Sequence, residues 1–545
     1  MYEQPPRGSL LQRHLFGAFG LTLLIALYLL PGAIGHEPWR GDDIKHFAVV
    51  YSMLGGEGWL FPHMAGRPLV EYPPLYHWVS ALFASLLGPL LPLHDAARLA
   101  TPFFAGLAIF WIARASARLY GRHTRTAAAL LTVGTLGLVV HAHENQPLIA
   151  LMAMQAMTLA GLALTPTQPV KGTLQACAGI ALAFLSAGLA GLLLTLPLTL
   201  IVTLTCRECR SPRASGALIL GLTLALLAIA AWPLALQRSE PELLSLWWAT
   251  DWARLTSSTL SLGDMPRTLE LLAWFIWPLW PIVLWSLWRN RRHLLQLPWM
   301  LPCTAMMLAA AWIYANGTFE AAAMLPLLPP MALIAAGGVP SLRRGAANAF
   351  DWFAVMTFGF FAILVWLAWS AQALFWPPGL ARSLDRMAPE LVLTGTTQQV
   401  ALGVTIVLVW LLLVLRLPRT VDRGPINWAM GMTMLWCLAV TLLMPWFDYN
   451  RNYKPVVQAL AEELENHPPS CIASMGLDPS HHAALDYHAG LRMHPVTLHE
   501  ARCSLVLVKD VQGSSTSAAA ESWDELWEYR HAGGRHLEVF RLYRR

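Results

Sequence analysis

The feature that most constrains this chain is a series of long apolar runs, many of them long enough to cross a bilayer, separated by shorter polar segments. Only 13% of the 545 residues are charged and 56% are hydrophobic, whereas a soluble protein carries about 25% charged residues. So few charges cannot solvate the surface of a protein this large, and lipid must cover much of it. The sequence therefore predicts an all-α polytopic membrane domain.

The distribution of Lys and Arg predicts which loops are cytoplasmic. If the ambiguous segment 76–92 does not cross the membrane, every basic loop falls on the cytoplasmic side. We therefore expect 76–92 to lie along the membrane surface, with the N-terminus cytoplasmic and the C-terminus outside. About thirteen spans result: 15–35, 99–119, 126–142, 147–164, 173–189, 190–205, 215–236, 268–288, 299–315, 319–340, 351–375, 398–416 and 426–446.

The basic residues do not form a nucleic-acid-binding surface. The formal net charge is only +5, and no Lys/Arg-rich run is interleaved with aromatic residues. The basic loops are short and lie between apolar runs, where membrane topology explains them. Nucleic acid is therefore not expected as a partner.

Three longer segments are predicted outside the membrane: 36–98, 237–267 and a tail at 447–545. The tail has a helical pattern at 453–466 and three strand-like stretches, CIASM, SLVLV and HLEVFRLY. We expect a transmembrane domain at 1–446 and a small periplasmic α/β domain at 447–545. If the tail is periplasmic, Cys471 and Cys503 can form a disulfide there.

The first outer loop, 36–98, carries the residue types that chemistry would need. Asp42 and Asp43 stand side by side just after the first span, and Phe47 and Val50 follow at helical spacing. We expect a helix from about Asp43, lying on the membrane surface. The two carboxylates either stabilise the start of that helix or act as a general base toward a sugar hydroxyl.

Other polar groups also allow two interpretations each. Glu71-Tyr72-Pro73-Pro74 is either a rigid turn or a site where Glu71 holds a metal or a substrate. The polar run 141–145, which contains Glu144, contacts lipid headgroups, a substrate or a metal. Arg254 pairs with Asp251 on a helix or binds phosphate.

The order GDDIKHFAVVYSMLGGEGWLFP and then AGRPLVEYPPLYHW resembles the first periplasmic loop of the aminoarabinose transferase and protein mannosyltransferase-like family. These are membrane-embedded, GT-C type glycosyltransferases with lipid donors. In that family an Asp-Glu pair opens a surface helix, and a Glu-Lys-Pro-Pro-Leu motif precedes the next helix. The resemblance extends to the thirteen spans, the Trp-rich segment near 247 and the α/β tail, and it implies a bacterial inner-membrane protein.

The resemblance implies a mechanism and assigns roles. A sugar on polyprenyl phosphate is transferred at the periplasmic membrane face to an acceptor, with lipid A, another glycan and protein all open. Asp42 matches the catalytic Asp and Asp43 its neighbouring acid, while Lys45 and Glu71 match a basic and an acidic position of the same loop. The family uses either a divalent metal or no cofactor, and the sequence does not choose between them.

Three departures from the family pattern affect these assignments. Tyr72 stands where the family has a Lys toward the donor phosphate, so Lys45, Arg67 or Arg254 would have to supply the charge. Leu148 stands where a second acid is expected, with Glu144 four residues earlier. A Lys expected in the fifth span is also absent, since Ala187 lies there.

Two other function classes compete with a glycosyltransferase. A transporter or flippase usually has charged residues near mid-membrane and internal repeats, whereas these spans carry almost no mid-helix charge and show no repeat. A structural or assembly protein would use the tail to bind a partner. We expect the glycosyltransferase.

Overall fold

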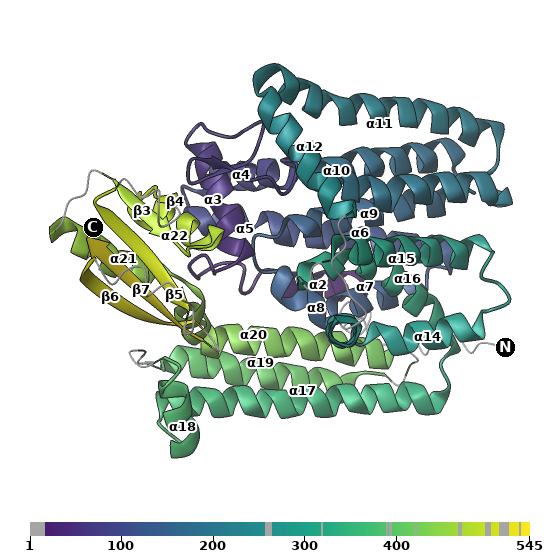
Figure 1. Cartoon of the computed structure of the whole chain (residues 1–545). Helices are drawn as coiled ribbons and strands as arrows, with labels where there is room; N and C mark the ends of the chain where they lie inside the picture. Colours follow the sequence, from purple (N-terminus) through teal and green to yellow (C-terminus); the bar gives the residue numbers. More distant parts are fainter. Residues whose placement is uncertain are drawn as a thin grey trace.

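The computed structural model describes residues 17–256, 264–317, 320–388, 391, 395–418, 420, 422–466, 471–495, 503–511, 523–533 and 536–544. A bundle of roughly parallel long helices forms most of the molecule, and a small sheet domain covers one end of it (Figure 1). Three short helices of the first loop, α3, α4 and α5, lie between the bundle and the sheet (Figure 1). The predicted all-α membrane domain with a small C-terminal α/β domain is confirmed.

The helices of the bundle have these bounds: α2 Ala18–Leu29, α6 Ala100–Leu119, α7 Thr124–Val133, α8 Leu136–His141, α9 Pro147–Leu164, α10 Pro169–Thr205, α11 Pro212–Ser239, α12 Pro241–Thr256, α13 Met265–Phe275, α14 Leu279–Arg289, α15 Leu297–Asn316, α16 Leu328–Gly338, α17 Arg344–Ala373, α18 Pro378–Asp385, α19 Thr397–Arg416 and α20 Arg423–Arg451. Short 3₁₀ turns lie at Arg207–Cys209, Ala321–Leu327 and Val339–Ser341.

Within the described residues, nine helices are long and apolar enough to cross a membrane, or ten if the bent pair α13 and α14 is one span. The described residues of the thirteen predicted segments lie mostly in helices, but several segments are divided differently. The first described helix, α2, has only 12 residues, and segment 126–142 is broken between α7 and α8 at Gly134 and Thr135. Hydropathy locates such segments, but it does not show where a helix breaks.

The predicted pair 173–189 and 190–205 is joined in one 37-residue element, α10, whose backbone leaves helical geometry at Ala187 and Gly188. A Cβ added to Gly191 would come within 2.1 Å of the carbonyl oxygen of Ala183. In a straight helix, residues eight apart are about 12 Å apart along the axis. The chain therefore bends sharply at Gly188, close to the boundary between the two predicted segments.

Exposure along the helices fits a lipid environment. Helix α9 has 94% of its most apolar window buried and lies at the centre of the bundle, whereas the corresponding windows of α11, α17 and α19 are only 17–22% buried. Their exposed residues are large and apolar, such as Ile219, Ile363 and Leu415. A soluble protein rarely exposes so much apolar surface, whereas acyl chains cover it favourably. The chain is a multi-pass membrane protein.

The first loop forms α3 Asp42–Leu54, a short hairpin of β1 His63–Met64 and β2 Arg67–Pro68, then α4 Leu75–Leu87 and α5 Leu93–Arg98. The apolar residues of α3 were predicted to face the membrane, and this is wrong. Phe47 and Val50 are fully buried in a core shared with the C-terminal domain, and the Phe47 ring lies 4.7 Å from that of Tyr487. An apolar stripe shows that a helix face is covered, but not what covers it.

The C-terminal domain contains a mixed five-stranded sheet in the order β4-β3-β5-β7-β6, with β3 parallel to β4 and β5 and the other pairs antiparallel. Its elements are α21 Lys454–Asn466, β3 Ile472–Met475, α22 Pro479–Ala489, β4 His494–Pro495, β5 Leu505–Val511, β6 Asp524–Gly533 and β7 His536–Arg544. The predicted helix and three strands are present. A disulfide joins Cys471, just before β3, to Cys503, just before β5.

Candidate active site

Asp42 and Glu71, which the sequence placed in two separate motifs, are joined by one lysine. Lys45 Nζ lies 2.7 Å from Asp42 Oδ1 and 3.0 Å from Glu71 Oε2. Asp42 and Lys45 share a face of α3 because they are three residues apart. Gln146 Nε2 donates to the second oxygen of Asp42 at 2.8 Å.

The charge state of Asp42 follows from these contacts. Burial alone would raise the pKa of Asp42, but the positive charge of Lys45 and the hydrogen bonds from Lys45 and Gln146 hold this pKa far below its ordinary value. Its side chain is 31% exposed. Asp42 is therefore an ionised carboxylate that a ligand can reach.

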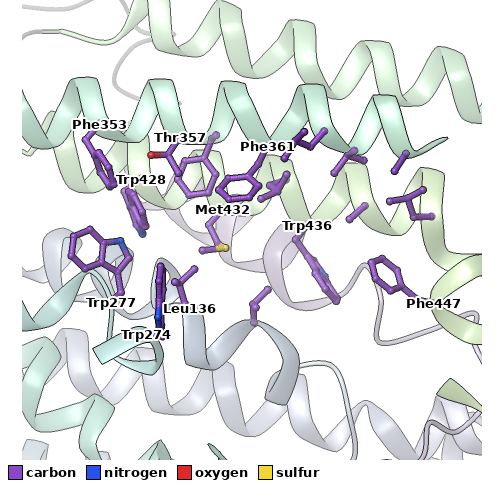
Figure 2. A pocket seen from close by; sticks show the side chains of 18 of the residues that line it. Leu136, Trp274, Trp277, Phe353, Thr357, Phe361, Trp428, Met432, Trp436 and Phe447 are labelled. Carbon is purple, nitrogen blue, oxygen red and sulfur yellow. The ribbon is translucent and has the colours of Figure 1, made fainter. Parts of the chain in front are cut away.

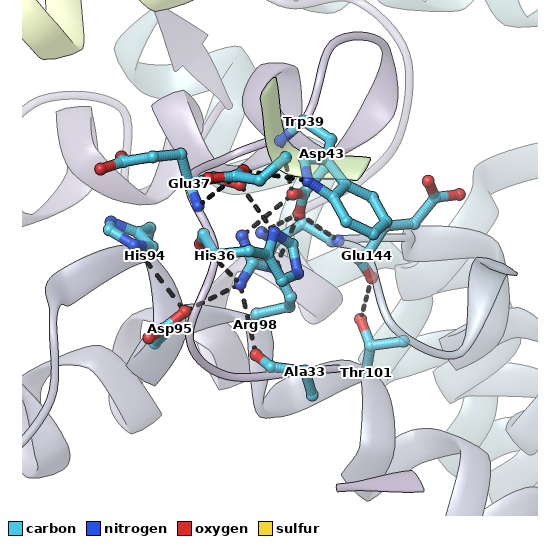
Figure 3. A network of polar contacts seen from close by, with 12 residues as sticks. Ala33, His36, Glu37, Trp39, Asp43, His94, Asp95, Arg98, Thr101 and Glu144 are labelled. Atoms are coloured by element: carbon cyan, nitrogen blue, oxygen red, sulfur yellow. Dashed lines mark hydrogen bonds and ion pairs between the residues drawn. The ribbon is translucent and has the colours of Figure 1, made fainter. Parts of the chain in front are cut away.

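Asp43, its neighbour, is fully buried and has every oxygen occupied (Figure 3). Arg98 approaches it with two nitrogens, at 3.1 and 3.0 Å. The backbone N–H of Trp39 donates to Oδ2 at 2.9 Å, and Asn145 donates to Oδ1 from its backbone at 2.8 Å and its side chain at 2.7 Å. Asp43 therefore supports the site and has no free lone pair directed at a substrate.

Arg98 extends this buried network toward the first helix (Figure 3). Its Nη1 also donates to Asp95 at 2.9 Å and to the carbonyl of Ala33 at 3.3 Å. The network joins the chain after α2, the start of α3 and the end of α5. Neither Asp42 nor Asp43 acts as a side-chain cap of α3, whose N-cap is Gly41. The pair serves tertiary contacts rather than capping.

Glu144 lies near this site but does not join the cluster at Lys45. Its Oε1 is 2.5 Å from His141 Nδ1, and its backbone carbonyl accepts a bond from Thr101 (Figure 3). Leu148 is buried in the first turn of α9, so no acid takes the place expected there. Gln146, between these two positions, is the residue that reaches Asp42.

Tyr72, in place of the family lysine, has an arginine beside its ring. The guanidinium carbon of Arg254 lies 5.8 Å from the centroid of the Tyr72 ring, within the range of a cation–π contact. Arg254 also donates to the backbone carbonyls of Val70, at 2.8 Å, and Glu71. Its Nη1 is 3.9 Å from Asp251 Oδ1, so the predicted helical ion pair is present on α12.

Asp251 occupies the region where the fifth-span lysine was expected. Its Oδ2 accepts a bond from the backbone N–H of Leu189 at 2.8 Å, just after the break at Gly188. The positive φ of 59° at Gly188 favours glycine, and a Cβ there would clash with Asp251 at 2.3 Å. Helix α12 is thus fastened to α10, which holds Arg254 beside the loop of Glu71.

Arg67 is not part of this cluster. It is exposed on the β1–β2 hairpin and donates to the backbone carbonyl of Met493 in the C-terminal domain, at 3.3 Å. As for a metal, the described part of the chain contains no group of three or more His, Cys, Asp or Glu residues placed to hold one.

Glu320, the residue just before the 3₁₀ turn Ala321–Leu327, is within electrostatic range of Asp42, Lys45 and Glu71. Its pKa is raised, first by burial and then by the negative charge of Asp42, with a smaller contribution from Glu71. In the sequence it lies at the start of the predicted span 319–340, where no motif marks it. A third acid therefore stands close to the Asp42–Glu71 pair.

An apolar cavity of about 950 Å³ lies in the bundle between α17 and α20 on one side and α8 and α13 on the other (Figure 2). Its α20 wall runs from Trp428 to Phe447, which is about 28 Å of helix. That length is close to the hydrocarbon thickness of a bilayer, about 30 Å. Helix α8, which contributes Leu136 and Val139, ends at His141, the partner of Glu144. The cavity suits a hydrocarbon chain.

Comparison with known proteins identifies the fold. No family model and no curated protein matches the sequence. The structure of ArnT from Cupriavidus metallidurans bound to undecaprenyl phosphate is similar, with a TM-score of 0.68 and 16% identity over 96% of this chain and 98% of that chain. The same protein in the apo state has a TM-score of 0.64, with 16% identity and the same coverage. The chain has the fold of ArnT, the GT-C fold that the sequence resemblance implied.

Proposed function

We propose that this protein is a glycosyltransferase that moves a sugar from a polyprenyl phosphate, such as undecaprenyl phosphate, to an acceptor in the bacterial envelope. The observation that carries the proposal is the site at Asp42. A reachable, ionised carboxylate is bound to Lys45, which also holds Glu71, and Arg254 binds the backbone of Glu71, at the end of a membrane bundle with the fold of ArnT. Lipid A, another glycan and protein all remain candidate acceptors, and the sugar is a hexose or a pentose.

The chemistry requires little from the protein beyond position and charge. An acceptor oxygen attacks the anomeric carbon, and the bond from that carbon to the phosphate oxygen breaks. Because phosphate leaves well, the enzyme has to orient the reactants, take the acceptor proton and stabilise the leaving group. Asp42 is the group that accepts the proton or orients the acceptor, and Asp43 holds α3 in place through Arg98.

Lys45 couples donor binding to the basicity of Asp42. In the structure it neutralises Asp42 and Glu71, and a carboxylate so well stabilised is a weak base. A donor phosphate would compete with both acids for the ammonium group. As Lys45 turns toward the phosphate, the pKa of Asp42 rises, so the base becomes stronger when the donor is bound.

Arg254 is the best candidate for the main phosphate contact. Its guanidinium bonds to two neutral backbone carbonyls, and its one ion pair among the described residues, with Asp251, is long at 3.9 Å. Lys45 is already shared by two carboxylates. Arg254 over the ring of Tyr72 therefore supplies the charge that the family lysine would supply from that position.

The location follows from the same features. A donor with a polyprenyl chain requires a membrane-embedded enzyme, and the apolar cavity lined by α8, α13, α17 and α20 offers space for such a chain. The disulfide between Cys471 and Cys503 supports an oxidising compartment for the tail. We place residues 1–446 in the inner membrane, with the N-terminus cytoplasmic and the 447–545 domain in the periplasm.

The test uses purified protein in liposomes with radiolabelled polyprenyl-phosphate hexose and pentose donors. Lipid A, an oligosaccharide and an unfolded peptide serve as acceptors, each with and without EDTA. We expect label on one acceptor class and release of polyprenyl phosphate, and the EDTA arm shows whether a divalent metal takes part. Absence of transfer from every donor, together with movement of a lipid-linked sugar or solute across the bilayer, would instead establish a transporter or flippase.

A further inference from the structure

Behind the acidic pair lies a pair of buried histidines with no role in the chemistry described so far. His46 follows Asp42 by four residues on α3, and His77 is on α4. Each is only 1% exposed. His46 Nδ1 lies 3.2 Å from His77 Nε2, so the two rings share one hydrogen bond.

The outer nitrogens of the pair are unpartnered. His46 Nε2 and His77 Nδ1 are buried and bond to nothing in the described structure. His46 Nε2 nevertheless faces both acids, at 4.0 Å from Asp42 Oδ1 and 3.8 Å from Glu71 Oε2. These separations are longer than a hydrogen bond but short enough to close with a small side-chain movement.

The shared bond restricts the protons to two arrangements. If His46 donates from Nδ1, its Nε2 is a bare lone pair that faces two carboxylates, which is repulsive. If His77 donates from Nε2, His46 carries its proton on Nε2 and directs an N–H at the carboxylates. Electrostatics favours the second arrangement.

The surroundings keep both rings neutral. The groups that face His46 are Asp42 and Lys45 from α3, Glu71 and Tyr72 from the preceding loop and His77 from α4. Burial and then the charge of Lys45 lower the pKa of His46, and the same two causes lower that of His77 to about 3. A neutral His46 can donate from one nitrogen only.

We propose that His46 is a positioning residue of the transfer site, which directs its Nε2–H at Asp42 and Glu71, and that His77 fixes this tautomer. The proposal rests on the function proposed above. When the donor phosphate draws Lys45 away, the two acids lose their common cation. His46 is the remaining buried donor that faces both, so it holds Asp42 in line while the acceptor binds.

The first test compares kinetics of paired variants. A Gln side chain can place an N–H near the position of Nε2, whereas Leu cannot, so each histidine is changed to both. We expect kcat to fall about tenfold to a hundredfold in His46→Leu and less in His77→Leu, with donor KM nearly unchanged. His46→Gln and His77→Gln should recover most of the rate.

The pH profile separates this role from a structural one. Loss of an N–H donor disfavours ionised Asp42, so the acidic limb of kcat/KM for the acceptor, measured at saturating donor, should move to higher pH in His46→Leu and return toward the wild-type position in His46→Gln. A merely structural histidine would lower the amount of folded, active enzyme in both variants without moving that limb. Such a result would overturn the proposal.

A second measurement does not depend on activity. Nitrogen-15 NMR of histidine-labelled full-length protein reports tautomer and charge, with the His46 signal assigned from its loss in His46→Gln. We expect a neutral, Nε2-protonated His46 at pH 7, and an Nδ1-protonated or charged ring would refute the assignment. If wild type transfers no sugar from any donor, the proposed function fails, while the tautomer still decides the arrangement of the pair.

Discussion

Asp42 and Asp43 are adjacent in sequence, yet the structure predicts opposite consequences for their replacement by asparagine. Asp43→Asn removes a buried charge that accepts two bonds from Arg98, one from Trp39 and two from Asn145. Asp42→Asn removes a partly exposed charge whose partner Lys45 still has Glu71. The first change should cost stability, and the second should leave stability nearly intact.

The magnitudes follow from burial. Arg98 and Asp43 are both 0% exposed, and breaking a buried ion pair costs about 3–5 kcal/mol. The Asp42–Lys45 pair is partly exposed, with side chains 31% and 16% accessible, and an accessible pair contributes about 0–1 kcal/mol. For 545 residues the unfolding entropy is roughly 1.1 kcal/mol per kelvin. The Tm should therefore fall by about 3–5 °C in Asp43→Asn, or more if membrane helices persist in the denatured state, and by about 1 °C or less in Asp42→Asn.

Tryptophan fluorescence during heating, in one detergent, measures the Tm of Asp42→Asn, Asp43→Asn and wild type. The control is the double variant Asp43→Asn with Arg98→Met. Removing both charges leaves no unpaired cation, so the double variant should be more stable than Asp43→Asn alone. The reasoning is refuted if Asp42→Asn and Asp43→Asn lose equal stability, or if Asp43→Asn melts like wild type.

Three further predictions concern binding, pH and the tail. Arg254→Gln should raise the donor KM about tenfold or more, and Arg254→Lys should have an intermediate effect because lysine keeps the charge but not the paired N–H donors. If steady-state assays give Arg254→Gln the donor KM of wild type, Arg254 does not bind the phosphate. The pKa of Asp43 is lowered in the folded state, so the contribution of its ionised form to stability is complete above the unfolded pKa of about 3.9 and is lost as the pH falls toward the lower folded pKa. Wild type should therefore lose stability below about pH 4 more steeply than Asp43→Asn. Measurements of Tm against pH for both proteins test this. The double variant Cys471→Ser and Cys503→Ser removes a disulfide that closes a loop with a sequence separation of 32, and it should destabilise the tail by about 3–4 kcal/mol. On heating, the tail of this variant should be cleaved by protease at a lower temperature than that of wild type. Cleavage at the same temperature would contradict this prediction.

Hydropathy predicted most of the fold because apolar length and charge bias are local properties of the sequence. The pattern located most of the helices and the strands of the tail, and the boundary between the segments 173–189 and 190–205 lies close to the break in α10. The covering of α3 was not predictable in the same way. A stripe with Phe47 and Val50 is the same whether lipid or another domain packs on it, and only tertiary structure brings Tyr487 there.

The candidate site was predictable where a motif holds it and not where distant segments meet. The resemblance assigned Asp42, Lys45 and Glu71 to one loop, and Lys45 contacts both acids in the structure. Gln146, by contrast, is 104 residues from Asp42 and had no motif of its own. The spacing of His46 four residues after Asp42 was a usable signal, since that spacing places both on one helix face.

The most direct test of the proposed function is the rate at which purified Asp42→Asn consumes a polyprenyl-phosphate sugar in liposomes that contain the acceptor identified with wild type. At saturating donor, we expect single-turnover transfer to fall by about 10²- to 10⁴-fold, while Tm and donor affinity stay close to those of wild type. Transfer by Asp42→Asn at the wild-type rate would contradict the assignment of Asp42 as the catalytic carboxylate.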